Sequence, residues 1–195
     1  MIDVNQLIIR VGNALVDDTF TLWSKDFHRC SLNDALAAIT LAYPALSNKT
    51  VEIQLTAGQW RVPLPDDAYL LLSVNHCNGY GLEQAERERI SHLYPDWRRQ
   101  MDTRPTNWMR NPDDPLTFFI FPSTQSVQPI ELTYSRYLHV SRDADGVDIH
   151  DIYTPLLFDY LMYRAYSRDG QAEAQQAKAA FHFQAFQLGL GQSDQ

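Results

Sequence analysis

The chain has 195 residues and a formal net charge of −8 at pH 7. Its length fits a single domain over residues 1–195. The excess of acidic residues argues against nucleic-acid binding through a basic surface. No apolar run reaches the ~18–20 residues of a membrane-spanning helix, so we expect no membrane insertion.

The N-terminal third predicts two amphipathic helices. The first covers residues ~3–16, with Asp3 as its cap, because apolar residues recur there with helical spacing, at Val4, Leu7, Ile8, Val11 and Leu15. The second covers ~24–43 and starts at Ser24 or, alternatively, at Ser31. It ends before Pro44, since the residue before a proline avoids the α region.

The middle of the chain, ~50–135, predicts a β-rich insertion. "TVEIQL" alternates apolar and polar residues, and Gly58 suits a hairpin turn that leads to a return strand with Trp60 and Val62. "AYLLLSVN", "LTFFIF" and "IELTYS" are further strand candidates. Residues 76–111 look irregular, with one short helix candidate, "LEQAERER". We expect the strands to form one β-rich lobe, with 76–111 as its extended part.

Two helices are predicted to close the chain, over ~155–168 and ~171–188. Thr154-Pro155 starts the first of them, and Asp169-Gly170 turns the chain between them. In the last helix we expect Ala177, Phe181 and Leu188 to face the core. The tail "GLGQSDQ" is expected to fray. Because strands and helices hardly alternate, the order of elements favours an α+β fold: a bundle of about four helices with a β-rich insertion.

No pattern in the sequence predicts catalysis, a cofactor or a metal centre. Phosphate loops, dinucleotide fingerprints and a nucleophile elbow are absent. The pairs His28/Cys30 and His76/Cys77 lack the spacing of a zinc site, and two isolated cysteines do not suggest a disulfide framework. "DADGVD" has its glycine at the wrong position for a calcium loop and is better explained as a solvated turn.

Two alternatives of another class stay open at this point. A small metal-dependent hydrolase would use loop aspartates with some of the five histidines His28, His76, His92, His139 and His150. A ligand-binding module would line a pocket with Trp60, Trp97 and Trp108, although such rings more often cover a small core.

The helix at ~155–168 carries apolar bulk around nearly its whole circumference. We expect Leu156, Tyr160 and Tyr163 to face the first two helices. The remaining apolar residues must be buried, either because the helix lies at the centre of the bundle or because a partner chain covers them. A partner chain is plausible from the composition, because interfaces are enriched in Tyr, Phe, Met and Arg. The candidate contact residues on the last two helices and the tail are Phe158, Met162, Phe183, Phe186, Leu188 and Leu190.

The ordered series of motifs resembles a known family. "LWSKDF", "LNDALAAI", "YPA", "TVEIQLTAGQWRVPLP", "YPDW", "NPDDPLTFFIFP", "IELTYS" and "LLFDYLMYRAYSRDG" follow one another from about residue 4 to 188. Together they resemble the head-to-tail connector (adaptor) proteins of tailed bacteriophages. "DYLMYRAYSRDG" before an alanine-rich helix is the most specific of these motifs.

The resemblance implies a structural virion protein without catalytic residues. Such adaptors assemble in the host cytoplasm into a homo-oligomeric ring, commonly of twelve copies. The ring lies in the virion neck, between the portal and the tail or nozzle proteins. Genomic DNA passes through the lumen without specific binding, and an acidic surface would suit that passage because it repels phosphate. The residues themselves add one expectation: the spare faces of the last two helices are apolar and the tail Gly189–Gln195 is short and polar, so we expect the C-terminal helix and the tail to reach the portal.

Overall fold

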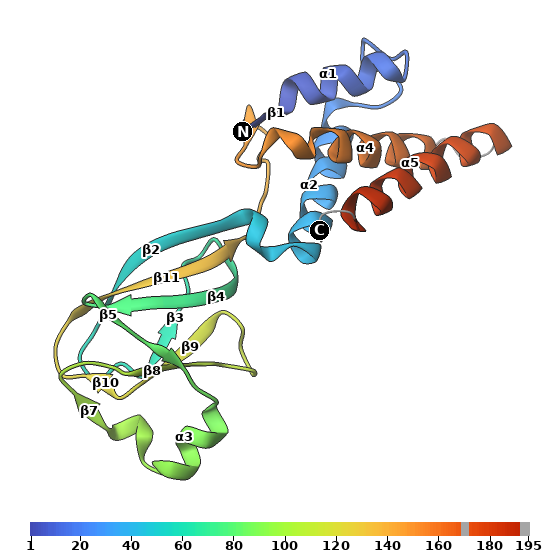
Figure 1. The fold of residues 1–195 in the computed structure, drawn as a ribbon. Helices are drawn as coiled ribbons and strands as arrows, with labels where there is room; N and C mark the ends of the chain where they lie inside the picture. Colours follow the sequence, from blue (N-terminus) through green and yellow to red (C-terminus); the bar gives the residue numbers. More distant parts are fainter. Residues whose placement is uncertain (169–171, 192–195) are drawn as a thin grey trace. The chain divides into compact units, whose positions relative to one another are not determined.

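Two helices, a β-rich middle and two further helices follow one another along the chain, which confirms the predicted α+β class (Figure 1). A computed structural model describes residues 1–168 and 172–191. The chain separates into two compact units, which we name the helical unit, Met1–Ser47 with Leu138–Gln195, and the β unit, Asn48–Tyr137. A fifth helix, α3, belongs to the β unit. Within the described ranges, no helix combines the length and apolar character needed to span a bilayer.

Helix α1 covers Val4–Ala14 and begins as predicted. The side chain of Asp3 caps it by accepting a hydrogen bond from the backbone N–H of Gln6, at 2.9 Å. The buried residues are Val4, Leu7, Ile8 and Val11, with Gly12 beside them, so the helical spacing in the sequence marks the inner face of the helix.

Helix α2 covers Lys25–Ala42 and starts at the first of the two predicted positions. Ser24 is its cap and accepts from the N–H of Phe27 at 3.2 Å, whereas Ser31 lies inside the helix and donates to the carbonyl of Phe27. The helix ends before Pro44, and the short 3₁₀ helix η1, Pro44–Ser47, follows it.

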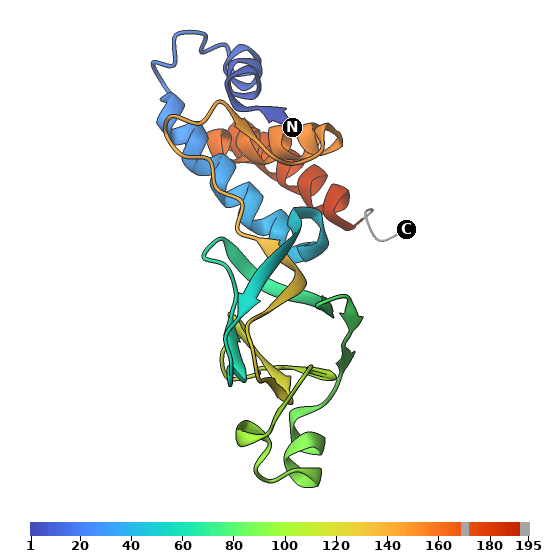
Figure 2. The same cartoon turned by 90° about the vertical axis from the view of Figure 1, so that its left-hand side faces the viewer.

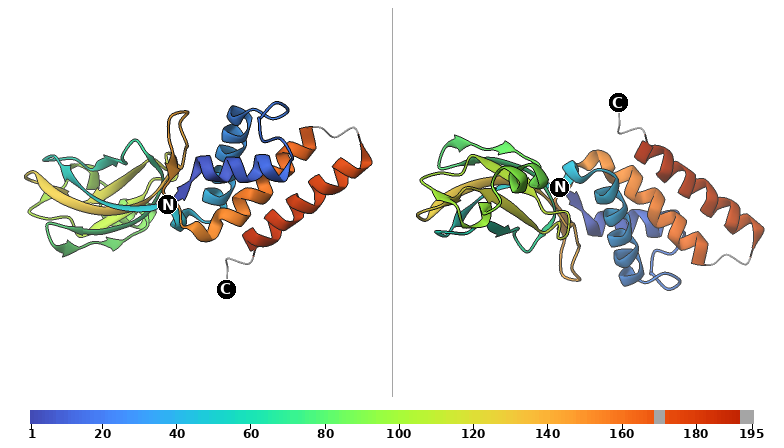
Figure 3. Two further views of the ribbon diagram at one scale, coloured as in Figure 1. Left: turned by 90° about the horizontal axis from the view of Figure 1, so that it is seen from above. Right: turned by 90° about the horizontal axis from the view of Figure 1, so that it is seen from below.

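Helices α4, Thr154–Arg168, and α5, Glu173–Gly191, run side by side in opposite directions in both views of Figure 3. The predicted Asp169-Gly170 turn lies outside the described residues, as do the last four residues of the tail. Residues 189–191 are helical, which corrects the prediction that the chain frays after 188. The helical unit is completed by η3, Asp151–Tyr153, and by a short pairing of β1, Ile2–Asp3, with β12, Gly146–Val147.

The first sheet of the β unit has the strand order β2-β11-β4-β5 and is antiparallel throughout. Its strands are β2 Asn48–Leu55, β11 Gln128–Arg136, β4 Ala68–Cys77 and β5 Tyr80–Gly81. Strands β4 and β5 are joined by Asn78-Gly79, and both of these residues have a positive φ. An Asn-Gly pair is a strong hairpin signal, and this one lies within the segment predicted to be irregular, 76–111.

The second sheet has the strand order β3-β9-β8-β6, and β6 pairs in parallel with β8. Its strands are β3 Arg61–Pro63, β9 Thr117–Phe121, β8 Asn107–Arg110 and β6 Glu83–Gln84. The predicted hairpin at Gly58 is wrong. Gly58 has φ 75°, as a turn glycine should, but β2 and β3 belong to different sheets, so the turn carries the chain from one sheet to the other.

The two sheets enclose one core, and α3 with its neighbours encloses another. Strand β9 shows why: Phe118 and Ile120 join the core shared by both sheets, while Phe119 and Phe121 join a second cluster with Ile90. The strand is therefore buried on both faces, which explains its continuous apolar run. Figure 2 shows the corresponding layers of this unit, with α3 beyond the second sheet.

The segment predicted to be irregular, 76–111, is mostly folded. Helix α3 covers Arg87–Leu93, about five residues later than the "LEQAERER" candidate, because Glu83–Gln84 form strand β6 instead. The 3₁₀ helix η2, Trp97–Arg99, follows, and β7, Met101–Asp102, pairs in parallel with β10, Ser123–Thr124.

Candidate functional site

The aromatic face of α4 meets α5, and not α1 and α2 as predicted. The ring of Tyr160 lies 4.8 Å from that of Phe186, and the ring of Tyr163 lies 4.7 Å from that of Phe183. A side chain at Gly189 would come within 2.5 Å of Leu156, so these two residues are also in close contact. The buried residues of α4 are Leu156, Leu157, Leu161, Met162 and Ala165, so Leu156 belongs to the core of the helical unit as predicted, together with residues of α1 and α2.

The predicted contact residues fall into three groups by burial. Met162 and Phe186 are 4% and 3% exposed and belong to the core of the helical unit, which corrects the expectation that they lie on a face left unused by the bundle. Phe158, Phe183 and Leu190 are half-buried. Leu190 packs against that core, and its carbonyl accepts a hydrogen bond from the hydroxyl of Tyr43. Leu188 alone among the six is well exposed, at 58%.

The inner face of α5 was assigned to the wrong residues. The buried residues are Ala179 and Phe186, whereas Phe181 is 66% exposed and Ala177 is exposed too. The error has a physical reason: alanine and glutamine occupy nine of the 19 positions of this helix, and neither distinguishes a core face from a solvent face. We name the exposed apolar stripe, Ala174, Ala177, Phe181 and Leu188, the α5 outer face.

The histidines proposed for a metal-dependent hydrolase are dispersed over both units. His28 and His150 belong to the helical unit, and His76 and His92 belong to the β unit. His76 lies 3.5 Å from Glu131, and Nδ1 of His150 accepts from the N–H of Ile152. Among the residues that the structure describes, no group of three or more His, Cys, Asp or Glu side chains could hold a metal ion.

His28 is a fully buried side chain, and neither ring nitrogen has a hydrogen-bond partner. Its ring packs edge-on against Phe20 and Phe27, at centroid distances of 6.1 and 5.5 Å. Burial lowers the pKa of His28 to about 4, although the charge of Asp17 acts in the opposite direction. His28 is therefore a neutral core residue near pH 7, and it is too enclosed to act as a general base.

Asp17 organises the loop between α1 and α2. Its carboxylate accepts hydrogen bonds from the N–H groups of Thr21, Leu22 and Trp23, at 2.8, 3.0 and 2.9 Å. These bonds, that of Trp23 first, hold the pKa of Asp17 below its usual value against the opposing effect of burial. The role of this carboxylate is structural.

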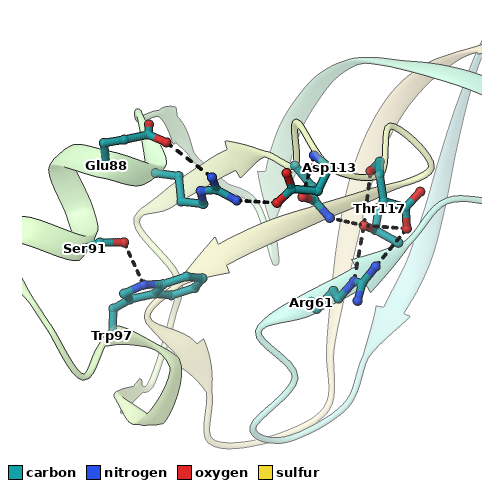
Figure 4. A network of polar contacts seen from close by, with 9 residues as sticks. Arg61, Glu88, Ser91, Trp97, Asp113 and Thr117 are labelled. Atoms are coloured by element: carbon teal, nitrogen blue, oxygen red, sulfur yellow. Dashed lines mark hydrogen bonds and ion pairs between the residues drawn. The ribbon is translucent and has the colours of Figure 1, made fainter.

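The three tryptophans proposed to line a pocket do not lie together. Trp97 meets Trp60 and Phe119, each at a centroid distance of 5.6 Å, and its indole N–H donates to Ser91 at 3.1 Å (Figure 4). Trp108 points to the core on the other side of the second sheet. These rings fill two separate cores instead of lining one binding site.

Arginines surround α3 and η2, and they differ in their partners. Arg87 donates to Asp113 at 2.8 Å and lies 3.4 Å from Glu88. Figure 4 labels these two carboxylate residues and marks both contacts with dashed lines. The hydrogen bond to Asp113 is the main cause that raises the pKa of Arg87. By contrast, Arg89, Arg98 and Arg99 are exposed, and none of them forms an ion pair with any described residue.

A sequence model of the SU10 adaptor protein family matches residues 2–195. The chain belongs to the SU10 adaptor family. The match covers nearly the whole chain, so the resemblance to phage adaptor proteins is confirmed. No curated protein matches the chain.

As an SU10-family member, the chain is a phage adaptor protein, and membership implies a place in the virion. It also indicates a structural role and not an enzymatic one.

Proposed function

We propose that the chain is a head-to-tail adaptor, which joins the portal of a tailed phage to its tail or nozzle proteins. The observation that carries the proposal is the family match over residues 2–195. The exposed surfaces support it, because an adaptor must present contact residues that its own core does not use. In this proposal the two units act as one adaptor domain, 1–195.

The adaptor acts as a homo-oligomeric ring, and twelve copies is the number that the family resemblance suggests. A ring needs two different surfaces on each copy, since each subunit contacts its two neighbours through different patches. Genomic DNA passes through the lumen without specific binding, in agreement with the net charge of −8. Native mass spectrometry of the assembled neck would give the number of copies directly.

The α5 outer face is the surface that we assign to the portal. Phe181 and Leu188 are seven residues apart, which places them on one side of the helix two turns from each other. Large apolar side chains that share an exposed helix face are typical of a docking surface. Leu188 is the one earlier candidate that fits this role well, and Phe181 joins it. Phe158, Phe183 and Leu190 are half-buried and could contribute only at the edge.

Co-sedimentation with purified portal rings tests this assignment. The double variant Phe181→Ser/Leu188→Ser should reduce binding at least about tenfold, because it removes both large apolar side chains of the face. The matched control is Val16→Ser/Ile152→Ser, which changes two exposed apolar residues of the same unit, at 89% and 70% exposure, that lie outside α5. Equal loss in both double variants, or no loss in either, would reject the α5 outer face as the portal contact.

A further inference from the structure

The β unit has four sheet edges, and the one formed by β2 is the longest (Figure 1). All eight residues of β2, Asn48–Leu55, pair with β11 on one side. On the other side, none of their backbone groups bonds to the backbone of a residue that the structure describes. An unpaired strand edge presents a row of N–H and C=O groups to which another strand can be added.

The other three edges are closed or very short. At the far edge of the same sheet, β5 pairs with the last two residues of β4, and Arg110 donates to the carbonyls of Leu71 and Leu72, at 2.7 and 3.2 Å. In the second sheet, β3 has three residues and ends at Pro63, which has no N–H to donate, and β6 has two residues. Proteins commonly protect their sheet edges in these ways, so the β2 edge stands apart as the one open to a further strand.

Strand β2 itself carries little of this protection. Its pairing with β11 is regular over eight residue pairs, without the register shifts that occur between β11 and β4. A lysine on an edge strand often protects it, but Nζ of Lys49 lies 3.2 Å from Asp67, close to the start of the strand. The edge from Thr50 onward is therefore long, regular and accessible.

The inward side chains of β2 indicate what an added strand must offer. Val51 and Ile53 pack against the core between the two sheets but are only half-buried, whereas Leu55 is fully buried. Apolar side chains on the same face of an added strand would complete the burial of Val51 and Ile53. Since successive residues of a strand face opposite sides, the added strand should alternate apolar and polar residues.

The outward side of β2 specifies a charge. Glu52 lies directly opposite Glu131 of β11, and like charges in that position destabilise a sheet. Glu131 accepts from the side-chain amide of Asn75 at 2.9 Å and lies 3.5 Å from His76. Glu52, by contrast, is exposed and forms no ion pair with any described residue. A lysine or arginine beside Glu52 on an added strand would compensate the two carboxylates.

We propose that the edge of β2 accepts a strand from the tail or nozzle protein, in which a lysine or arginine lies between two apolar residues. The inference rests on the proposed adaptor function, in which α5 serves the portal and the other partner has no assigned surface. A second copy of this chain does not supply the strand. Its other edges are closed or short, and pairing of β2 with β2 would be a two-fold contact, which a ring of successive neighbours does not contain.

Photo-crosslinking in assembled virions tests the proposal at two matched positions. The full chain carries p-benzoylphenylalanine in place of either Gln54 or Gln84, two exposed glutamines on the edge strands β2 and β6. It is supplied during infection, purified particles are irradiated, and the cross-linked peptides are identified by mass spectrometry. We expect position 54 to cross-link to the tail or nozzle protein, at a lysine or arginine flanked by apolar residues. Position 84 should give at least about tenfold less product.

A charge reversal tests the part played by Glu52. Glu52→Lys, combined with the cross-linker at position 54, should lower the yield at least about tenfold, because like charges then face each other across the contact. This substitution also removes the like-charge pair with Glu131, so the thermal midpoint of the chain should not fall. A loss of cross-linking is thereby separated from a loss of folding. Glu83→Lys makes the same change at an exposed residue of β6 and should leave the yield unchanged.

The outcomes distinguish this proposal from the adaptor function on which it rests. No cross-link from position 54, equal cross-linking from both positions, or a cross-link to a second copy, to the portal or to DNA would overturn it. An acidic sequence at the cross-linked segment, or equal loss in Glu52→Lys and Glu83→Lys, would overturn it as well. Absence of the chain from virions would instead refute the adaptor function itself.

Discussion

Two buried ionisable residues near the start of the helical unit, Asp17 and His28, differ in whether they carry a charge. Asp17 keeps its charge because three backbone N–H groups donate to it, whereas His28 has no partner for either nitrogen and stays neutral. Neither role could be predicted from the sequence. Asp17 and Asp18 look equivalent there, and His28 could have been a metal ligand.

The neutral state of His28 makes the helical unit sensitive to acid. Its pKa is lowered from 6.5 to about 4 on folding, so the unfolded chain binds a proton at a higher pH than the folded chain does. Stability due to this group is complete above about pH 6.5 and is lost as the pH falls through the window from 6.5 to 4. Asp17 acts only at lower pH, because its stabilising charge is lost below its ordinary value of 3.8.

The variant His28→Leu tests this effect by urea unfolding. Between about pH 7 and about pH 4.5, the original chain should lose ~2–3 kcal/mol more stability than the variant, since leucine takes up no proton. Other acidic groups titrate equally in both proteins, so the difference isolates His28. Parallel losses in the two proteins would show that the imidazole is not held neutral.

The Asp17 loop gives a second prediction, with its neighbour as the control. Asp17→Ala leaves three backbone donors without their acceptor and should clearly lower the thermal midpoint of the helical unit. Asp18→Ala removes the same charge from an exposed side chain and should leave the midpoint unchanged. If the two variants melted alike, the hydrogen bonds of Asp17 would contribute nothing.

At the scale of the elements, the sequence predicted periodic and capped segments well and the pairing of strands poorly. Helices α1 and α2 start at Asp3 and Ser24 because those side chains satisfy free N–H groups, a local effect that the sequence displays. The hairpin at Gly58 was wrong because the sheet to which a strand belongs depends on contacts distant in sequence. In the candidate site, Leu188 was expected both to face the core of the bundle and to contact a partner, and its exposure of 58% contradicts the first expectation. Phe186 was wrongly placed outside the core because the alanine-rich α5 gives no sign of its inner face, and Met162 because apolar side chains surround α4 on nearly all sides.

The contact between α4 and α5 can be tested by comparing two leucine-to-alanine variants, one at a buried position and one at an exposed position. Leu156 is 9% exposed and lies against Gly189, whereas Leu188 is 58% exposed. Leu156→Ala should therefore cost about 2–5 kcal/mol in unfolding free energy, and Leu188→Ala should stay within about 0.5 kcal/mol. Chemical denaturation measures both. A cost for Leu188 as large as that for Leu156 would contradict the inner face assigned to α5.

The folded state of the segment around α3 depends on Trp97. Replacing this 3% exposed side chain by alanine should cost about 3–5 kcal/mol, because it empties the centre of a cluster with Trp60 and Phe119. Leu93→Ala, at 57% exposure in the same segment, is the control and should change little. Tryptophan fluorescence during denaturation follows both. Insensitivity to Trp97→Ala would mean that the segment has no stable core.

At the scale of the molecule, charge is divided unequally between the units. The helical unit contains thirteen Asp and Glu against seven Lys and Arg, a net of −6, and the β unit contains eleven against nine, a net of −2. The net charge of the whole chain does not reveal this division, because it sums the strongly acidic helical unit and the nearly balanced β unit.

The β unit should fold on its own. Its first and last strands pair with each other, with Asn48 opposite Ser135, so its two ends lie together as they do in a self-contained insertion. Residues 48–137 expressed alone are expected to unfold in one cooperative transition with a blue-shifted tryptophan emission. A fragment without cooperative unfolding would show that this unit needs the helices.

The central claim, that the chain joins the portal to the tail, is tested most directly by electron microscopy of particles assembled without it. We predict heads that contain a portal and lack a tail, and we predict that supplying the full chain restores tailed particles. Complete tailed virions formed in the absence of the chain would contradict the claim.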